Sequence, residues 1–494
     1  MWFVFPGPET FALSSLGYLW LYHLVDKMEN VNIERIYSDT KTTDIIRDKI
    51  DLIAFSLSFD MDYLQVLSFL EKNNYAFKSK DRKDTDPLIY AGGPVTTANP
   101  QPYKEIFDFF VIGDGEDVNL EIVRICSENK NLTKIQKLEL LSKIDGIYVP
   151  SLKQKKVVKS TKKLSECIYT PIISEKAFFK NTFILEAERG CSNRCGFCLA
   201  SYLNLPIRFV EYQKIIDAVE LGLSKTNKIA LLGAQITAHP DFEKICGYIH
   251  SKIKQGENIE MSVSSLRVDS FKAPIVQTLV DAGQKNLTLA IEAGSERLRK
   301  VINKHLTEEQ IFKAIDVARE CGLRGLKFYG MIGLPTETQK DIEEIINLTK
   351  RIKNQYKNFG ISFGFSTFVP KPNTPFQWIG RLDEKELERR ANYLKKELHK
   401  LGIEASVSSA KWDYWQAVLS RGDEKLSDFI IEVYKQGGKL GAFKKAARDL
   451  NIDTDYYAYT DFTFEHTMPW DFIETKPGKE FLIQENKRLL NITD

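Results

Sequence analysis

Three cysteines within eight positions form the pattern with the clearest chemical potential in this sequence. Cys191, Cys195 and Cys198 are spaced by four and three residues, so their thiolates can wrap one corner of a cube-shaped cluster. Thiolate ligands select zinc or iron–sulfur centres. A structural zinc wants a fourth Cys or His close by, and residues 199–228 contain neither. Three protein ligands leave one iron open, and an open coordination position is what substrate chemistry needs.

The elements that must position these cysteines begin at residue 182, where the sequence becomes a regular alternation of strands and helices. The cysteine segment directly follows the first strand. Six strand–helix repeats predict a partial (β/α)6 barrel over residues 181–375, with its chemistry on the loops after the strands. The expected strands are 183–187, 229–232, 259–263, 287–291, 325–329 and 361–365.

An earlier alternation of strands and helices fills residues 1–150. Short apolar runs at 2–5, 33–37, 52–58, 88–91 and 109–112 are separated by helical stretches, which predicts a doubly wound, Rossmann-like α/β domain. Ligands of such sheets bind at the carboxyl ends of the strands. Two glycine-rich turns lie there, at residues 92–94 and 113–116.

The two remaining segments differ in composition. Residues 151–180 open with a basic stretch and are expected to form a linker or exposed hairpin, and residues 376–494 are expected to form a mainly helical C-terminal domain. A solvated linker explains the lysines of 153–163 most simply, and a contact surface for an anionic macromolecule is the alternative.

Composition narrows the class of protein. Lys plus Arg number 69 and Asp plus Glu 67, so no global field recruits nucleic acid. No apolar run approaches the length of a bilayer span, and the N-terminus lacks the basic region of a signal peptide. Seven cysteines, four of them scattered singly, do not form a disulfide framework. A cytoplasmic protein without membrane contact is therefore expected.

The CxxxCxxC spacing, with Phe197 before the last cysteine, resembles the signature of the radical S-adenosylmethionine (SAM) superfamily. The resemblance implies a [4Fe–4S] cluster on the three cysteines, with SAM chelated at the open iron and Phe197 against the adenine. It also implies that further SAM-binding residues follow the later strands. These residues are Gly233, Ala234, Gln235, Ser265, Arg267, Glu292, Gly333, Leu334 and Pro335. For each of these strand-end positions, ordinary turn or capping chemistry is the alternative.

The order of the segments resembles the cobalamin-binding class of this superfamily. The sequence resembles an uncharacterised bacterial subgroup more closely still. The motifs that carry this resemblance are at residues 51–63, 91–102, 109–117, 366–378, 419–423 and 468–472. The Asp-x-His-x-x-Gly motif that supplies a cobalt ligand is absent, since the only earlier histidine, His23, lies in an apolar helical stretch. The positions that would cradle a corrin are Ser56, Ser58, Gly92, Gly93, Gly113, Gly115 and Glu116. An inherited scaffold that no longer binds cobalamin is the alternative.

The resemblance implies an enzyme that cleaves SAM reductively and starts radical chemistry, with cobalamin-associated methyl transfer as the expected reaction and a flavodoxin- or ferredoxin-like electron donor. One alternative is a non-catalytic iron–sulfur or corrinoid-binding protein. Another is a methylthiotransferase-like modifier of RNA or protein. That reading needs three N-terminal cysteines for a second cluster, and residues 1–180 contain only Cys126 and Cys167.

Overall fold

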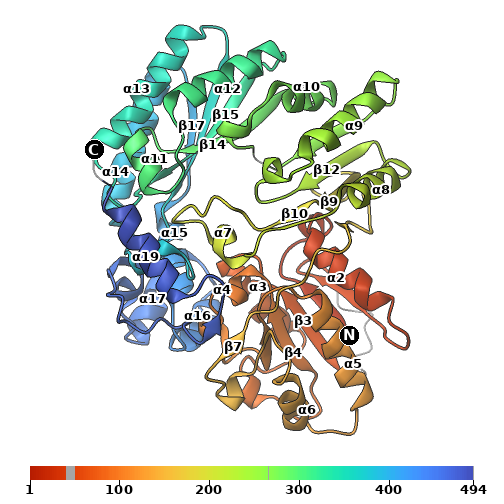
Figure 1. The fold of residues 1–494 in the computed structure, drawn as a ribbon. Helices are drawn as coiled ribbons and strands as arrows, with labels where there is room; N and C mark the ends of the chain where they lie inside the picture. Colours follow the sequence, from red (N-terminus) through yellow and green to blue (C-terminus); the bar gives the residue numbers. More distant parts are fainter. Residues whose placement is uncertain (41–49, 265, 493–494) are drawn as a thin grey trace.

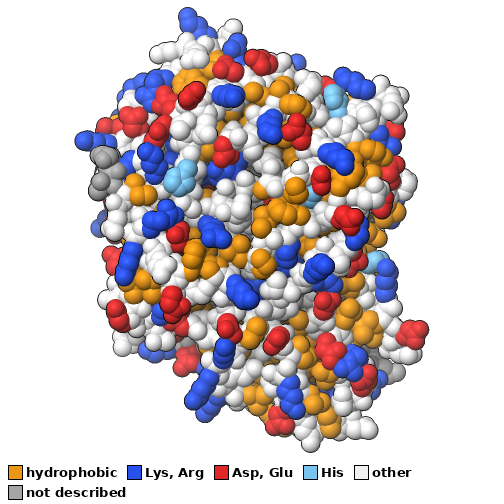
Figure 2. All heavy atoms as spheres, viewed as in Figure 1, with side chains coloured by type: hydrophobic (Ala, Val, Ile, Leu, Met, Phe, Trp, Pro, Cys, Tyr) orange, Lys and Arg blue, Asp and Glu red, His pale blue; other side chains and the backbone are white. Residues whose placement is uncertain are grey.

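The computed structural model describes residues 1–40, 50–264 and 266–492. Two parallel-stranded α/β regions face each other, and C-terminal helices lie beside both (Figure 1). Within the described ranges, no helix is long and apolar enough to cross a membrane. Acidic and basic side chains are interspersed over the face shown in Figure 2, as the balanced composition predicts.

The N-terminal region is a six-stranded sheet of order β2-β1-β3-β4-β5-β6, in which only β6 is antiparallel. This confirms the predicted doubly wound sheet. Helices α2 (Leu16–Asp26) and α5 (Glu116–Glu128) cover one face, and α3 (Tyr63–Lys72) lies on the other. The strands are β1 Trp2–Phe5, β2 Glu34–Tyr37, β3 Leu52–Ser56, β4 Leu88–Gly92, β5 Phe109–Val111 and β6 Ile147–Tyr148.

The barrel region contains all six predicted strands, parallel to their neighbours. Three of them lie in each of two four-stranded sheets, which are joined by a bridge between Leu266 and Leu289. Apolar strand residues face the surrounding helices and make one core. The strands are β9 Thr182–Glu186, β12 Lys228–Leu232, β13 Glu260–Val263, β14 Asn286–Glu292, β15 Gly325–Ile332 and β16 Gly360–Thr367. The helices are α8 Tyr212–Leu223, α9 Phe242–Lys254, α10 Ala273–Asp281, α12 Glu308–Glu320 and α13 Gln339–Gln355.

Two short strands extend this barrel beyond the prediction. β8 (Ile168–Tyr169) pairs antiparallel with β9, and β17 (Glu404–Val407) pairs parallel with β16 after helix α14 (Glu384–Lys400). The sequence signal for β17 is weak because it is four residues long and only half-buried. Barrel structure therefore continues past residue 376.

The C-terminal helices complete the core of the N-terminal sheet. Trp415, Phe429 and Trp470 share one buried cluster with Phe55 of β3 and Tyr63 of α3. These two tryptophans therefore pack the C-terminal region against the N-terminal sheet. One helix, α3, cannot cover a whole sheet face, so α15–α17 supply the missing apolar surface. The helices are α15 Ala410–Arg421, α16 Leu426–Lys435, α17 Leu440–Asp449, α18 Thr454–Tyr459 and α19 Lys479–Leu490.

The basic stretch does not form a hairpin. β7 (Val157–Val158) pairs parallel with β18 (Ile473–Glu474), and Ser160 bridges to Gly113. Alternation along this strand directs Lys159 inward, where it is only 7% exposed, while Lys153, Lys155, Lys156 and Lys163 stay exposed. The segment thus contributes to the protein interior as well as to the surface.

Candidate active site

The cysteine loop leaves the end of β9 and returns through helix α7 (Leu199–Leu203). Its base is a two-residue antiparallel pairing of β10 (Glu188–Arg189) with β11 (Arg208–Phe209). Gly190 has a φ of +96°, and a Cβ there would lie 2.7 Å from the carbonyl oxygen of Asn204. Only glycine suits that turn. Cys191 and Cys195 are buried, and Cys198 is half-buried.

Burial opposes the ionisation of two thiols of this loop. Burial raises the pKa of Cys195 to about 12 and also raises that of Cys198. Among the described residues, no three His, Cys, Asp or Glu side chains converge as one metal ion requires. A tetrahedral zinc needs such convergence, whereas thiolates of a cubic cluster bind separate irons. Three thiolates, each able to bind a separate iron, are a donor set that fits a cubic iron–sulfur cluster.

The turn after β12 lies against Cys191. The Gln235 carboxamide oxygen is 3.5 Å from the Cys191 sulfur and contacts the Asn193 amide. The backbone N–H of Gln235 donates to Oε1 of Glu188 at 2.5 Å. Glu188 is 1% exposed, and its Oε2 has no hydrogen-bond partner among the described residues. Burial raises the pKa of Glu188 to about 7.

Glu188 could not be predicted from its sequence context, because a carboxylate in a strand normally faces solvent. Its role is visible only at Gly233, where an added Cβ would lie 2.9 Å from Glu188 Oε1. Gly233 also accepts a hydrogen bond from Ser264 Oγ at 2.7 Å, and Ala234 lies between it and Gln235. The glycine allows the turn to approach the buried carboxylate.

Ser265 and Arg267, which follow β13, are the next two residues expected to bind SAM. Ser265 lies outside the described residues. Arg267 makes an ion pair with Asp269 at 2.7 Å and donates to the carbonyl oxygen of Lys304 at 3.2 Å. Its positive charge lies near Cys195 and Cys191.

Glu292 ends β14 in an unusual backbone conformation. Its φ is +64°, next to a register shift in the pairing with β15. A left-handed non-glycine residue costs about 1–2 kcal/mol, and such strain clusters at functional sites. The Glu292 carboxylate accepts from Lys304 Nζ at 2.9 Å, and Lys304 is 5% exposed. Sequence reasoning missed Lys304, whose only signal is its place in the turn after α11 (Glu296–Val301).

The turn after β15 contains Gly333, Leu334 and Pro335. Gly333 has a φ of +79°, and its N–H donates to Oε1 of the buried Glu337 at 2.9 Å. Leu334 belongs to an apolar cluster against which Phe197 of the cysteine loop packs. Phe197 and the Gly-Leu-Pro turn thus contribute to the same apolar cluster.

Two adjoining cavities lie at the carboxyl edge of the N-terminal sheet, with volumes of about 440 and 270 Å³. Gly17 of α2 lines both, and a Cβ built on it meets nothing within 4 Å. A glycine inside a helix costs about 1 kcal/mol relative to alanine, so this position favours space over stability. All seven residues expected around a corrin line these cavities. Glu116 lines the larger cavity, and Ser56, Ser58 and Gly92 line the smaller one. Both cavities are lined by Gly93, Gly113 and Gly115.

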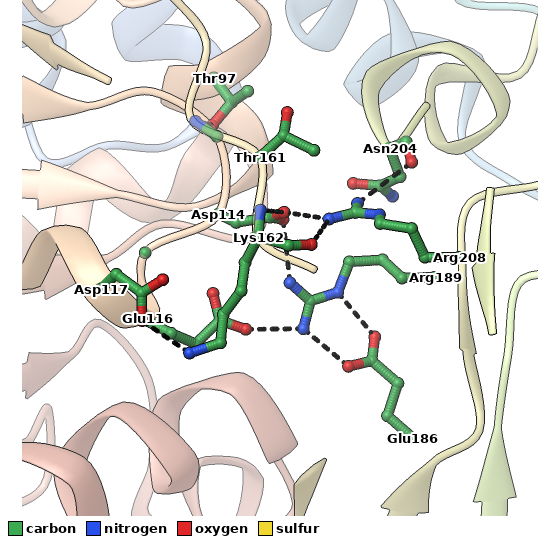
Figure 3. A network of polar contacts seen from close by, with 12 residues as sticks. Thr97, Asp114, Glu116, Asp117, Thr161, Lys162, Glu186, Arg189, Asn204 and Arg208 are labelled. Atoms are coloured by element: carbon green, nitrogen blue, oxygen red, sulfur yellow. Dashed lines mark hydrogen bonds and ion pairs between the residues drawn. The ribbon is translucent and has the colours of Figure 1, made fainter. Parts of the chain in front are cut away.

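An ionic network joins the larger cavity to the cysteine loop (Figure 3). Arg189 makes ion pairs with Asp114 at 2.9 Å, Glu116 at 2.8 Å and Glu186 at 2.7 Å. Arg208 also contacts Asp114. The sequence shows the GDGE turn and the arginine separately, and only the fold shows that they meet.

Both α/β regions match known sequence families. Residues 17–150 match the N-terminal region of radical SAM proteins, and residues 186–349 match the radical SAM superfamily. The chain belongs to the radical SAM superfamily. It is 31% identical to the uncharacterized protein MJ0966 of Methanocaldococcus jannaschii, over 90% of this chain and 93% of that protein.

Two solved structures share the fold. The cobalamin-dependent SAM radical enzyme OxsB, with aqua-cobalamin and SAM bound, has a TM-score of 0.55 and 13% identity, over 99% of this chain and 78% of that one. The radical SAM methyltransferase TsrM of Kitasatospora setae, with cobalamin and a [4Fe–4S] cluster bound, has a TM-score of 0.55 and 12% identity, over 74% and 71%. The chain is thus an enzyme of the class that combines a [4Fe–4S] cluster with SAM.

Proposed function

We propose that Cys191, Cys195 and Cys198 hold the cluster and that the enzyme modifies its substrate by cobalamin-associated methyl transfer. The observation that carries the proposal is the convergence of barrel strand ends on the cysteine loop. Gln235 contacts Cys191, and Phe197 packs against the apolar cluster that contains Leu334. When bound, the cluster and SAM would supply one-electron cleavage of the sulfonium, and cobalamin would supply a methyl carrier.

The chain's own residues would bind and orient SAM. Glu292 offers a carboxylate oxygen, on a side chain that is 13% exposed, for a hydroxyl or ammonium group, while Lys304 balances its charge. The Gly233–Gln235 turn offers backbone groups beside Cys191, and Phe197 with Leu334 offers an apolar surface for a purine. Gly196 N–H donates to the Ile302 carbonyl oxygen at 3.1 Å, which ties the loop to the barrel.

Cobalamin fits the two adjoining cavities of residues 1–150 because glycines surround them and Gly17 leaves their junction open. No histidine is among the described residues that line them, so the corrin would bind without a protein imidazole. The methylthiotransferase alternative is less well supported. Cys126 and Cys167 are both buried, in two different cores, so they offer no second cluster site.

The proposal is tested by anaerobic reconstitution with iron and sulfide, followed by dithionite and SAM. We expect visible cluster absorbance and formation of 5′-deoxyadenosine, both lost in the triple variant Cys191→Ala, Cys195→Ala, Cys198→Ala. A flavodoxin- or ferredoxin-like donor should replace dithionite. An intact cluster that forms no 5′-deoxyadenosine would exclude the enzymatic function.

Cobalamin binding is tested separately, by the absorbance of protein desalted after incubation with hydroxocobalamin. Gly17→Phe should abolish corrin retention because the ring would fill the junction of the cavities. Gly247→Phe is the matched control, since Gly247 lies on helix α9 with nothing within 4 Å of its built Cβ. Wild-type protein that retains no corrin would overturn this part of the proposal.

A further inference from the structure

A third cavity, of about 200 Å³, lies where both parallel sheets meet the C-terminal helices. Residues 58–60 follow β3, residues 94–99 follow β4, and Lys371 follows β16. The cavity is therefore at the carboxyl edge of the N-terminal sheet and of the barrel sheet that contains β16. That edge is where α/β proteins bind ligands. Leu199, which directly follows Cys198, forms part of the wall.

This cavity unites sequence segments that the proposed SAM and cobalamin sites leave largely unexplained. Most of its lining residues come from four of the segments that resemble the bacterial subgroup, which lie far apart in the chain. These segments are residues 51–63, 91–102, 366–378 and 419–423. Only Leu199 and Gln416 come from elsewhere.

One wall of the cavity is polar. Lys371 Nζ donates to Asp60 Oδ2 at 2.8 Å and to Ser420 Oγ at 2.7 Å. Gln416 Nε2 donates to Asp60 Oδ2 at 3.1 Å, and Ser420 Oγ donates to Asp60 Oδ1 at 3.1 Å. Asp60 is 8% exposed and Ser420 3%. The remaining walls are mainly apolar, from Phe59, Pro94, Val95, Ala98, Pro372 and Leu419.

The polar wall retains free hydrogen-bonding capacity. An ammonium has three N–H groups, and Lys371 uses two of them among the described residues. Gln416 uses one N–H, and its carbonyl oxygen has no partner within the same residues. A donor and an acceptor therefore remain side by side. Because the Lys371 charge is already matched by Asp60, a charged ligand group would add an unbalanced buried charge, which is costly.

We propose that this cavity receives part of the substrate, namely an apolar group that bears one neutral polar head, a carboxamide or a hydroxyl. The head bonds Lys371 and Gln416, and the apolar body lies against Pro94, Val95 and Leu199. The inference rests on the proposed function, because it places the substrate next to the cysteine loop of a radical SAM enzyme.

Four small molecules that share a similar branched apolar body and differ in their polar head group test which head group the cavity binds. They are 3-methylbutanamide, 3-methylbutanol, 3-methylbutanoate and 3-methylbutylammonium, measured by saturation-transfer NMR on the reconstituted enzyme under argon. The amide and the alcohol should bind saturably, and the two charged probes should bind about tenfold or more weakly. Equal or tighter binding of either charged probe would overturn the proposed class.

Variants test the location. Gln416→Met removes hydrogen bonds without changing charge and should weaken the amide probe about fivefold. Gln436→Met is the matched control at the residue directly after α16, and should leave binding unchanged. Ala98→Leu should weaken every probe by filling the cavity. Probe binding that neither Gln416→Met nor Ala98→Leu alters would overturn the assignment. If the wild-type enzyme forms no 5′-deoxyadenosine yet binds the amide as expected, the proposed reaction fails and the cavity assignment stands.

Discussion

Arg189, two residues before the first cysteine of the loop, makes a 2.8 Å ion pair with Glu116 at the start of α5 in the N-terminal sheet. The two side chains are 15% and 6% exposed. The proposed cluster loop and the cavity next to it are therefore held by one guanidinium. A change in the N-terminal region can reach the cysteine loop through this contact.

Arg189→Met should destabilise the protein because it removes the cation that Glu116 and Glu186 share, while Asp114 keeps its contact with Arg208. Removing one partner of a buried ion pair costs about 3–5 kcal/mol. Anaerobic urea unfolding measures this cost, and iron content after desalting should fall in parallel. Arg124→Met is the control, since the exposed Arg124 pairs with Glu121 and Glu128 on its own helix. Equal effects of the two substitutions would contradict the role of the network.

Glu188→Gln should change how stability depends on pH. Burial raises the pKa of Glu188 from 4.5 to about 7. Between these values the folded state holds a proton that the unfolded chain releases, so stability falls as pH rises through this window. The full change is roughly 3 kcal/mol at 1.4 kcal/mol per pKa unit.

The variant lacks this titration, so its free energy of unfolding should fall less between pH 5 and 8. Burial also raises the pKa of Glu337 to about 7, and its contribution has the same sign. The dependence should therefore be reduced but not abolished. Urea unfolding of the reconstituted enzyme at four pH values measures it. Parallel curves for the variant and the wild type would show that Glu188 is ionised in the folded protein.

Gly233→Ala should weaken SAM binding without unfolding the protein. The new Cβ would press on the Glu188 side chain and displace the turn that contacts Cys191. Isothermal titration of the reconstituted enzyme with SAM should show at least about a tenfold loss of affinity. Gly247→Ala on helix α9 meets nothing within 4 Å. It should keep full affinity and gain about 0.5–1 kcal/mol of stability.

The strands and the cysteine loop could be predicted because their signals are local. Apolar runs of strand length mark β9, β12 and β15, and thiol spacing alone marks the cluster ligands. Contacts between distant segments could not be predicted in this way. Lys304 reaches Glu292 only through the bend after α11, and Trp415 covers β3 only because the C-terminal helices fold back. No pattern within either segment encodes such a pairing.

Glu292 allows backbone strain to be separated from carboxylate chemistry. Glu292→Ala and Glu292→Gly both remove the carboxylate and leave the buried Lys304 without its 2.9 Å partner. Alanine keeps the cost of a φ of +64°, whereas glycine adopts it freely. Glu292→Gly should therefore be more stable than Glu292→Ala by about 1 kcal/mol in urea unfolding.

Both Glu292 variants should lose SAM affinity to the same extent, because neither provides an oxygen for a ligand hydroxyl or ammonium. Titration with SAM measures this loss. If the more stable glycine variant recovered affinity, backbone placement at the end of β14 would matter more than the carboxylate. If both variants bound SAM as tightly as the wild type, Glu292 would serve only to pair with Lys304, and its strained backbone would have a structural origin.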